Sequence, residues 1–366
     1  MGISLRLERR MGAPVALRIA VPVFAVVGGL VVGGVVMALG GHDPIDAYVS
    51  VWEGSLGSTD GLQSTLIKAT PLVLTGLAVA TALRVGLWNI GGEGQLIAGA
   101  IAATGTGLYA AALPAPILLV AMILAGCAGG AVWAAIAVIP RALIGLNEII
   151  VTLFMNYIAI LFMDHLIFGP WGDPKAFGFA YSRALPDGTS LPLIPGTGVH
   201  IGILLAVVVA LGAWWLMERT PWGFSVRVAG GNPRAAEYLG LGISRRMVVV
   251  LAISGAIAGL AGAIELTGVT NRLQEGISVN YGYSGVLIAF LARGRLLAVG
   301  IAAFLFAALV VGSYALQTTG VAQPIATIIQ ALIIVFLLAG DAVLAFRLRV
   351  TRPAFVADVA AAGGLP

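Results

Sequence analysis

The chain has 366 residues, of which 60% are hydrophobic and only 10% are charged. Soluble domains carry about 25% charged residues, so this composition excludes an ordinary soluble protein and indicates that most of the chain lies in lipid. The net charge of +4 comes mainly from arginine. We interpret it as a signal of membrane orientation and expect no nucleic-acid partner.

Apolar runs follow one another along the whole chain. A bilayer core of about 30 Å needs about 20 helical residues, and most of the runs reach that length. They lie at 19–39, 62–83, 88–110, 116–139, 146–168, 199–217, 247–268, 280–292 (the short one), 296–316 and 322–340. The predicted fold is therefore an all-α integral membrane protein with about ten transmembrane helices, forming a single transmembrane domain over residues 1–366.

The basic residues are distributed unequally along these runs. Arginines 6, 9, 10 and 18 precede the first run, which predicts a cytoplasmic N-terminus over residues 1–18. With alternating crossings, all but four of the 20 lysines and arginines fall on the inner side, the exceptions being Lys68, Lys175, Arg183 and Arg272. The pattern predicts both termini inside, an outer loop at 169–198, a cytoplasmic loop at 218–246 and a cytoplasmic tail at 341–366. Lys68, near the outer end of its run, is expected to snorkel to the surface.

Glycine recurs with small-xxx-small spacing in three of the runs. The pairs are Gly29 with Gly33, Gly126 with Gly130, and Gly255 with Gly259. Such spacing favours close approach of helices in lipid, and helix packing is the interpretation we adopt.

Motifs for chemistry are absent from the sequence. Neither lysine, Lys68 or Lys175, belongs to a P-loop, and the three histidines lie far apart, outside any metal-binding pattern. No G-x-S-x-G motif occurs. We therefore expect no enzyme, no metal and no cofactor bound by this chain, so that ATP, if it drives transport, is used by partner subunits.

Asn89, Glu93 and Gln95 stand among three glycines at the start of the run 88–110. Glycine at this density exposes backbone groups, which lipid does not tolerate unless they face protein or a water-filled path. One interpretation is a broken helix that lines a solute route. The other is an interfacial turn closed by Asn89 and Glu93.

A polar stripe marks the next candidate site, because Glu148, Thr152 and Asn156 are spaced four apart and share one helix face. Asn147 suits an N-cap, with Glu148 favoured in the first turn. Asn156 lies about 15 Å deeper by helical rise, too deep for a cap. It needs either an interhelical partner or a place on the solute route, and the sequence leaves both open.

The segment 280–289 repeats the pattern of 89–98, since N-x-G-x-x-G-x-L-I-A occurs in both. The orientation count places the two segments in opposite directions, as in a weak inverted repeat. A chance match among common residues is the alternative. If the repeat is real, two half-helices flank a central pathway, to which Asn280 and Ser284 would contribute.

The polar segment 218–246 contains a short helix signal of its own. Asn232 suits an N-cap, Pro233 the first helical position and Gly240 a helix stop. A helix of about seven residues does not persist alone in water, so we expect it to dock on another protein. A positive-inside loop lying on anionic headgroups, the alternative, explains the arginines but not the capped Ala-Ala-Glu-Tyr-Leu core.

Three stretches carry a family resemblance: Leu87–Gln95, Asn147–Tyr157, and Gly223 through Asn232–Gly240. They resemble the permease subunits of bacterial ABC importers, closest to the nucleoside and simple-sugar permeases of the branched-chain amino acid/ribose permease family. The resemblance implies a ten-helix permease of the bacterial cytoplasmic membrane that pairs with a second permease, either a paralogue or an identical copy. It also implies two cytoplasmic ATPases and an extracytoplasmic solute-binding protein, for which 169–198 is the natural surface.

The same resemblance assigns a coupling helix that sits in a groove of the ATPase. Its residues in this chain are Asn232, Pro233, Arg234, Ala235, Ala236, Glu237, Tyr238 and Gly240. The candidate solute-pathway residues are Asn89, Glu93, Gln95, Thr152, Asn156, Asn280 and Ser284.

The leading hypothesis is an importer permease for nucleosides or related simple sugars. One alternative is an ion-coupled secondary transporter with an inverted repeat, using Glu93 or Glu148 as a proton or sodium site. Another is a structural or receptor-type membrane subunit. The sequence leaves the exact solute open.

Overall fold

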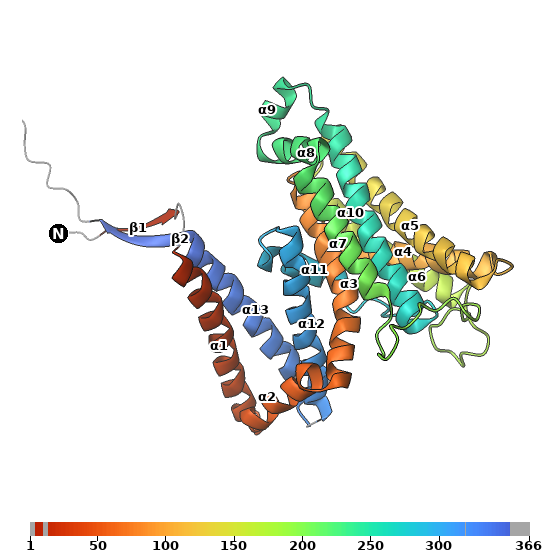
Figure 1. The fold of residues 1–366 in the computed structure, drawn as a ribbon, viewed down its shortest axis with the longest axis horizontal. Helices are drawn as coiled ribbons and strands as arrows, with labels where there is room; N and C mark the ends of the chain where they lie inside the picture. The colour runs from red at the N-terminus through yellow and green to blue at the C-terminus, as the bar shows by residue number, and fades with distance from the viewer. Residues whose placement is uncertain (1–3, 10–13, 319, 352–366) are drawn as a thin grey trace, which may run out of the picture. The chain divides into compact units, whose positions relative to one another are not determined.

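The computed structural model describes residues 4–9, 14–318 and 320–351 (Figure 1). The predicted N-terminal segment 1–18 and tail 341–366 are therefore covered only in part. Arg10 and Arg352, which entered the orientation count, lie outside the described residues.

The described chain is predominantly helical, as expected. A helix occupies each of the ten predicted apolar runs, with further short helices between them. The helices are α1 (Val15–Leu39), α2 (Pro44–Trp52), α3 (Thr59–Leu83), α4 (Gly92–Tyr109), α5 (Ala115–Ile144), α6 (Glu148–Phe168), α7 (Gly202–Arg219), α8 (Pro221–Gly231), α9 (Pro233–Tyr238), α10 (Ile243–Glu265), α11 (Tyr281–Leu291), α12 (Leu296–Thr318) and α13 (Gln323–Ala345), with π-helical turns η1 (Glu53–Gly57) and η2 (Leu266–Thr270).

Seven helical segments in the described residues are long and apolar enough to cross a membrane. They are α3, α5, α6, α7, α10 with η2, α12 and α13. Membrane-spanning helices are thus confirmed. The count of ten crossings and the placement of both termini inside stay predictions, since α11 is only 11 residues long and α4 begins with polar residues.

The chain divides into two compact units, one comprising residues 1–48 with 316–366 and the other residues 49–315. In the first unit α1 packs along α13. The strands β1 (Ser4–Arg9) and β2 (Phe346–Thr351) pair antiparallel, with Ser4 opposite Thr351 and Arg9 opposite Phe346. The all-α expectation missed this ribbon. Both strands alternate apolar and polar residues, the period of a strand, but their arginines also fit a signal of membrane orientation, which hides the strand pattern.

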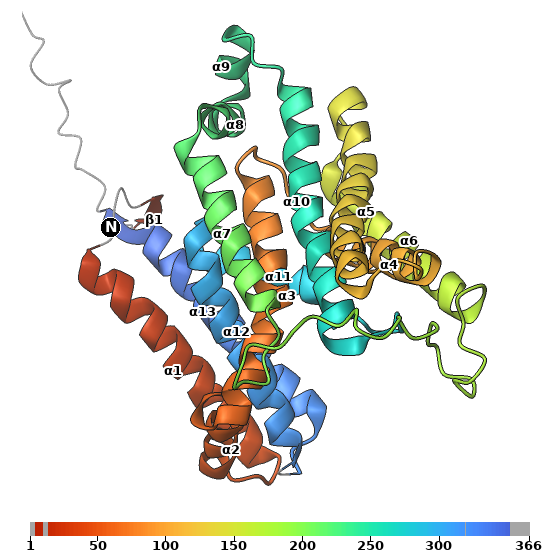
Figure 2. The same ribbon diagram turned by 45° about the vertical axis from the view of Figure 1, so that its right-hand side comes forward.

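In the larger unit α10 is the central helix, in contact with α3, α4 and α5 (Figures 1 and 2). The predicted glycine packing is confirmed here. A Cβ added to Gly130 would lie 2.2 Å from the carbonyl oxygen of Gly255, and one on Gly259 would lie 2.2 Å from that of Gly126. Only glycine allows α5 and α10 to come this close, so their backbones are in direct contact.

The two ends of the larger unit differ in character. At one end, which we call the arginine end, lie the last turns of α3 and α7 together with α8 and α9 (Figure 2). Arg84 and Arg227 contact Glu218 there, at 2.7 and 3.4 Å. The segment 169–198 lies at the opposite end (Figure 2). Its backbone is bonded to the chain after α10, with Ser182 N donating to Leu273 O at 2.8 Å. This separation agrees with the predicted arrangement, in which a basic cytoplasmic face lies opposite an outer face that carries the long loop.

Candidate functional site

The helix α4 begins in the interior of the larger unit. Asn89, which precedes it, donates through Nδ2 to Gln95 Oε1 and to Ser254 Oγ, both at 2.8 Å. Ser254 is the twelfth residue of the 23-residue α10 and donates to Ala78 O of α3 at 2.6 Å. The first turn of α4 therefore lies beside the midpoint of a membrane-spanning helix, which is the geometry of a broken helix.

Asn156 holds this turn from the side of α6. Its Oδ1 accepts from Gly94 N at 2.8 Å, and its Nδ2 donates to Ile90 O at 3.0 Å and to Tyr283 Oη at 3.1 Å. The interhelical partner that the sequence left open is thus present. Because the amide uses both its donor and its acceptor atoms, it joins α6 to α4 and α11.

The other two residues of the predicted polar stripe on α6, Thr152 and Glu148, contact residues that are close to them in the sequence. Thr152 Oγ1 donates to Glu148 O at 2.7 Å, one turn earlier in the same helix. Glu148 lies 3.4 Å from Arg141 Nε. Asn147 accepts from Ile149 N at 3.0 Å, so its prediction as the N-cap of α6 is confirmed.

The two segments that share the N-x-G-x-x-G pattern meet in the structure. Gly282 N, at the start of α11, donates to Glu93 Oε2 at 2.8 Å. A Cβ on Gly282 would lie 2.1 Å from Glu93 N, so the two first turns touch through their backbones. From this contact α4 runs toward Trp171, which donates to Tyr109 Oη at 3.1 Å.

The helix α11 runs the other way, to the arginine end. Phe290, near its end, lines a cavity of about 260 Å³ together with Arg293 and Gly294, which follow the helix, and with Leu83 and Arg84 at the end of α3. Two helices whose first turns touch and which then run in opposite directions are what an inverted repeat predicts. The repeat itself stays a prediction.

Five of the predicted pathway residues are sealed inside the chain. Asn89, Glu93, Gln95, Thr152 and Asn156 are 0–3% exposed. In the described conformation a solute does not reach these side chains, and their contacts fix α4 against its neighbours. Asn280 is exposed and Ser284 is half-buried, so these two are the predicted pathway residues that reach a surface.

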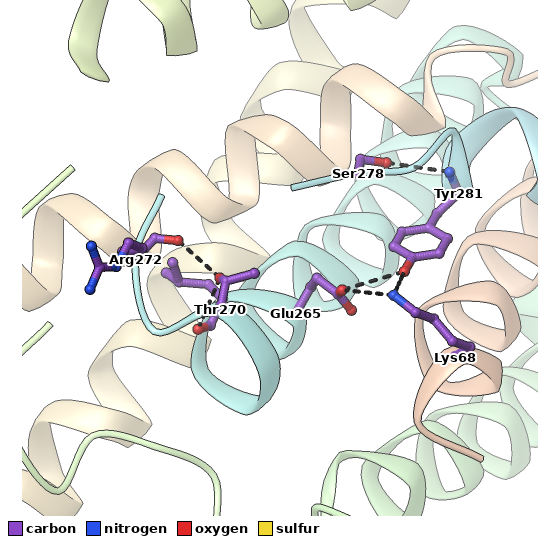
Figure 3. A network of polar contacts seen from close by, with 7 residues as sticks. Lys68, Glu265, Thr270, Arg272, Ser278 and Tyr281 are labelled. Carbon is purple, nitrogen blue, oxygen red and sulfur yellow. Dashed lines mark hydrogen bonds and ion pairs between the residues drawn. The ribbon is translucent and has the colours of Figure 1, made fainter. Parts of the chain in front are cut away.

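A second polar cluster, not foreseen in the sequence, joins α3, α10 and α11 (Figure 3). Lys68 Nζ donates to Tyr281 Oη at 2.6 Å and lies 3.7 Å from Glu265 Oε1. Tyr281 Oη donates to the same carboxylate oxygen at 3.3 Å. The expectation that Lys68 snorkels to the surface stays a prediction, since its side chain is 25% exposed while its ammonium also finds an acceptor and a countercharge within the protein. Opposite charges in two predicted spans, Lys68 and Glu265, were the signal that could have revealed the pair.

The predicted short helix of the segment 218–246 is confirmed as α9. Asn232 Oδ1 accepts from Ala235 N at 3.1 Å, and Gly240 ends the helix with a φ of 68°. Ala236 is buried, whereas Tyr238 and Leu239 are 93% and 67% exposed. The helix thus presents an aromatic and an aliphatic side chain outward.

The helix α8, directly before α9, was missed. Its cap is of the same kind, since Thr220 Oγ1 accepts from Gly223 N at 3.0 Å and Pro221 stands at the first position. The Thr-Pro pair was as clear a start signal as Asn232-Pro233. It was overlooked because the arginines of this segment suggested a loop.

In the segment 169–198, Trp171 is buried while Lys175, Arg183 and Asp187 are exposed. The latter three are placed to meet another molecule, as are the exposed apolar side chains of Phe177 and Phe179. The described residues contain no group of three or more His, Cys, Asp or Glu side chains able to hold a metal ion.

Membrane-spanning helices around α4 and α11, whose first turns meet in the interior, with a capped helix at one polar end, are typical of a multi-pass membrane transport protein. Residues 61–338 match the family model for the permease component of the branched-chain amino acid transport system, and the chain belongs to this family. It is therefore a multi-pass permease of the cytoplasmic membrane, from a family of transport subunits.

Relatives align over most of the chain. The glucose ABC transporter permease of Haloferax volcanii is 36% identical over 93% of this chain and 92% of its own length. The guanosine ABC transporter permease of Bacillus subtilis is 32% identical over 88% of this chain and 94% of its own. The ribose import permease of Escherichia coli is 27% identical over 56% of this chain and 59% of its own.

Proposed function

We propose that this chain is the permease subunit of an ABC importer for nucleosides or related simple sugars, driven by separate ATPase subunits. Relatives named as glucose, guanosine and nucleoside ABC transporter permeases align with it over nearly their full length. The single observation that carries the coupling role is α9, a helix too short to persist alone in water that exposes Tyr238 and Leu239.

The arginine end is, in this proposal, the cytoplasmic end. Arginine is enriched on the cytoplasmic side of membrane proteins, and the arginine end also carries α9. The sequence holds no P-loop, so two ATPases in the cytoplasm would bind the nucleotide and receive the exposed face of α9. A second permease, identical or paralogous, would complete the pathway, and a solute-binding protein would meet the 169–198 segment.

Contacts along the chain support a route for motion from α9 to the pathway. The helix α8 follows α7 and leads into α9, and it rests against the end of α3, where a Cβ on Gly230 would lie 2.4 Å from Arg84 O. The chain 84–91 links that point to the first turn of α4. A displacement of α9 would therefore reach the place where Gly92 and Gly282 meet, through backbone contacts that cannot compress.

In the transport cycle the first turns of α4 and α11 would separate and come together again. Glu93, Gln95 and Asn156 are sealed in the described conformation, and in this proposal they come to line the pathway when α4 and α11 separate. Asn280 and Ser284 would face it in both states. The protein performs no bond chemistry, and its action is a change of conformation with different contacts to solute in each state.

A cross-link from α9 to the ATPase tests the coupling role. Cys127 is the only cysteine, so a Cys127→Ser background carrying Tyr238→Cys gives one defined position. We expect it to cross-link to the ATPase subunit and the cross-link to weaken when ATP is replaced by ADP.

The matched control is Leu143→Cys, at an exposed apolar residue in the last turn of α5. It should give no cross-link. Equal cross-linking from both positions, or none from Tyr238→Cys in an assembled complex, would show that α9 is not the coupling helix.

A further inference from the structure

The Lys68–Glu265–Tyr281 cluster is not explained by stability alone. Ionisable groups in a membrane-spanning segment are costly and mark functional sites. A buried ion pair is often no more stable than the apolar residues that could replace it. An apolar contact would join α3, α10 and α11 as well as these three side chains do.

The cluster exposes only its cation. The Lys68 side chain is 25% exposed, against 4% for Glu265, and Tyr281 is buried. An ammonium has three N–H donors. One is used by Tyr281 Oη and a second is directed toward Glu265, so the contacts that the described residues make leave a third for a molecule outside the chain (Figure 3).

The cluster also adjoins the contact between α4 and α11. Tyr281 directly precedes Gly282, whose N–H is bound by Glu93. Asn280, exposed, directly precedes Tyr281, and Ser284 lies one turn further along α11. Lys68 therefore bonds to the residue that directly follows Asn280 and lies one turn before Ser284, the two predicted pathway residues that reach a surface.

We propose that Lys68 is a solute-binding subsite of this permease, donating to hydroxyl oxygens of a neutral, hydroxyl-rich solute. Glu265 and Tyr281 are positioning residues that hold the ammonium in place. Because the Glu265 carboxylate balances the ammonium, the site offers a directed donor without net charge, which suits a free sugar or nucleoside better than its phosphate. The inference rests on the proposed function and names the part of the pathway that touches the solute.

The decisive variant removes both charges, since Lys68→Met alone would leave the buried Glu265 carboxylate without a countercharge and so destabilise the protein. Lys68→Met/Glu265→Gln keeps the site neutral and close in volume. The complete transporter, with its ATPases and second permease, is reconstituted in liposomes with internal ATP and external solute-loaded binding protein. We expect the double variant to keep the wild-type melting temperature and stimulated ATP hydrolysis but to lose at least tenfold in uptake. Glu53→Gln, an exposed glutamate outside the cluster, should change nothing.

Uptake by the double variant within twofold of wild type would overturn the inference. The cluster would then serve only to hold α3, α10 and α11 together. Lys68→Arg gives a second measurement that does not depend on the folding of the double variant, because it retains the ion pair. It should raise the KM for uptake at least threefold without changing stimulated ATP hydrolysis, and an unchanged KM would overturn the inference. Absence of ATP-dependent uptake by the wild type would instead overturn the proposed function, and this inference with it.

Discussion

Substitution of Gly282 by alanine tests whether α4 and α11 must touch. The added Cβ would lie 2.1 Å from Glu93 N and 2.4 Å from Glu93 Cα. Ordinary van der Waals contact begins at 3.4 Å, so the helices must separate by 3.4 − 2.1 = 1.3 Å. The obstacle is backbone on both sides and cannot rotate away.

The expected cost follows from two effects. Overpacking costs about 1–3 kcal/mol, and weakening the bond from Gly282 N to the Glu93 carboxylate adds about 1.5–3 kcal/mol. The better helix propensity of alanine returns up to about 1 kcal/mol. We expect a net loss of about 3 kcal/mol in the free energy of unfolding, seen as a melting temperature lower by at least about 5 °C in detergent, together with reduced uptake.

Gly212→Ala is the matched control, because no atom lies within 4 Å of a Cβ there. It should be neutral or stabilise the protein by up to about 1 kcal/mol. A Gly282→Ala protein that melts within 1 °C of wild type, on the scale of about 2–4 °C per kcal/mol, would refute the backbone contact.

Other residues give further tests. Asn156→Leu should lower the free energy of unfolding by about 2 kcal/mol, because Gly94 N and Ile90 O lose their partner. Gln317→Leu, at an exposed position near the end of α12, should cost less than about 0.5 kcal/mol, and equal melting temperatures of the two variants would contradict the assigned bonds. Burial lowers the pKa of His200, which lies before α7 and accepts from Gly202 N at 3.2 Å. The unfolded chain therefore binds a proton more readily, and the structure around His200 should lose stability as pH falls below about 6.5. The protection factors of the amides 169–201, which correct for the intrinsic pH dependence of hydrogen exchange, should fall there in wild type but not in His200→Phe, and pH-independent protection in wild type would contradict this. Gly230→Ala, which pushes α8 off the end of α3, should lower solute-stimulated ATP hydrolysis at least threefold with membrane insertion unchanged, and unaltered stimulation would remove α8 from the coupling route.

The elements that the sequence predicted best depend on local chemistry. Apolar runs mark spans because lipid leaves the backbone few other choices, and the caps Asn147 and Asn232 act within one turn of their own position. The prediction of close helix packing from the glycine pairs of α5 and α10 was also confirmed, because close backbone contact needs the absence of a side chain whatever the partner is.

What the sequence did not reveal depends on contacts between distant segments. Glu265 and Lys68 are nearly 200 residues apart, and only the fold brings α3 and α10 together. The burial of Asn89 and Gln95 could not be predicted either, because the glycines of a broken helix are compatible with an open solute route and with a closed contact between helices. The terminal ribbon formed by β1 and β2 pairs residues from opposite ends of the sequence.

Transport itself tests the central claim most directly. The purified permease, its partner permease and the ATPases are placed in liposomes, and uptake of radiolabelled guanosine or glucose is measured with a binding protein outside. The account predicts uptake that requires both internal ATP and the binding protein and that persists when an ionophore collapses ion gradients. Uptake that the ionophore abolishes while ATP is irrelevant would contradict it and favour an ion-coupled carrier.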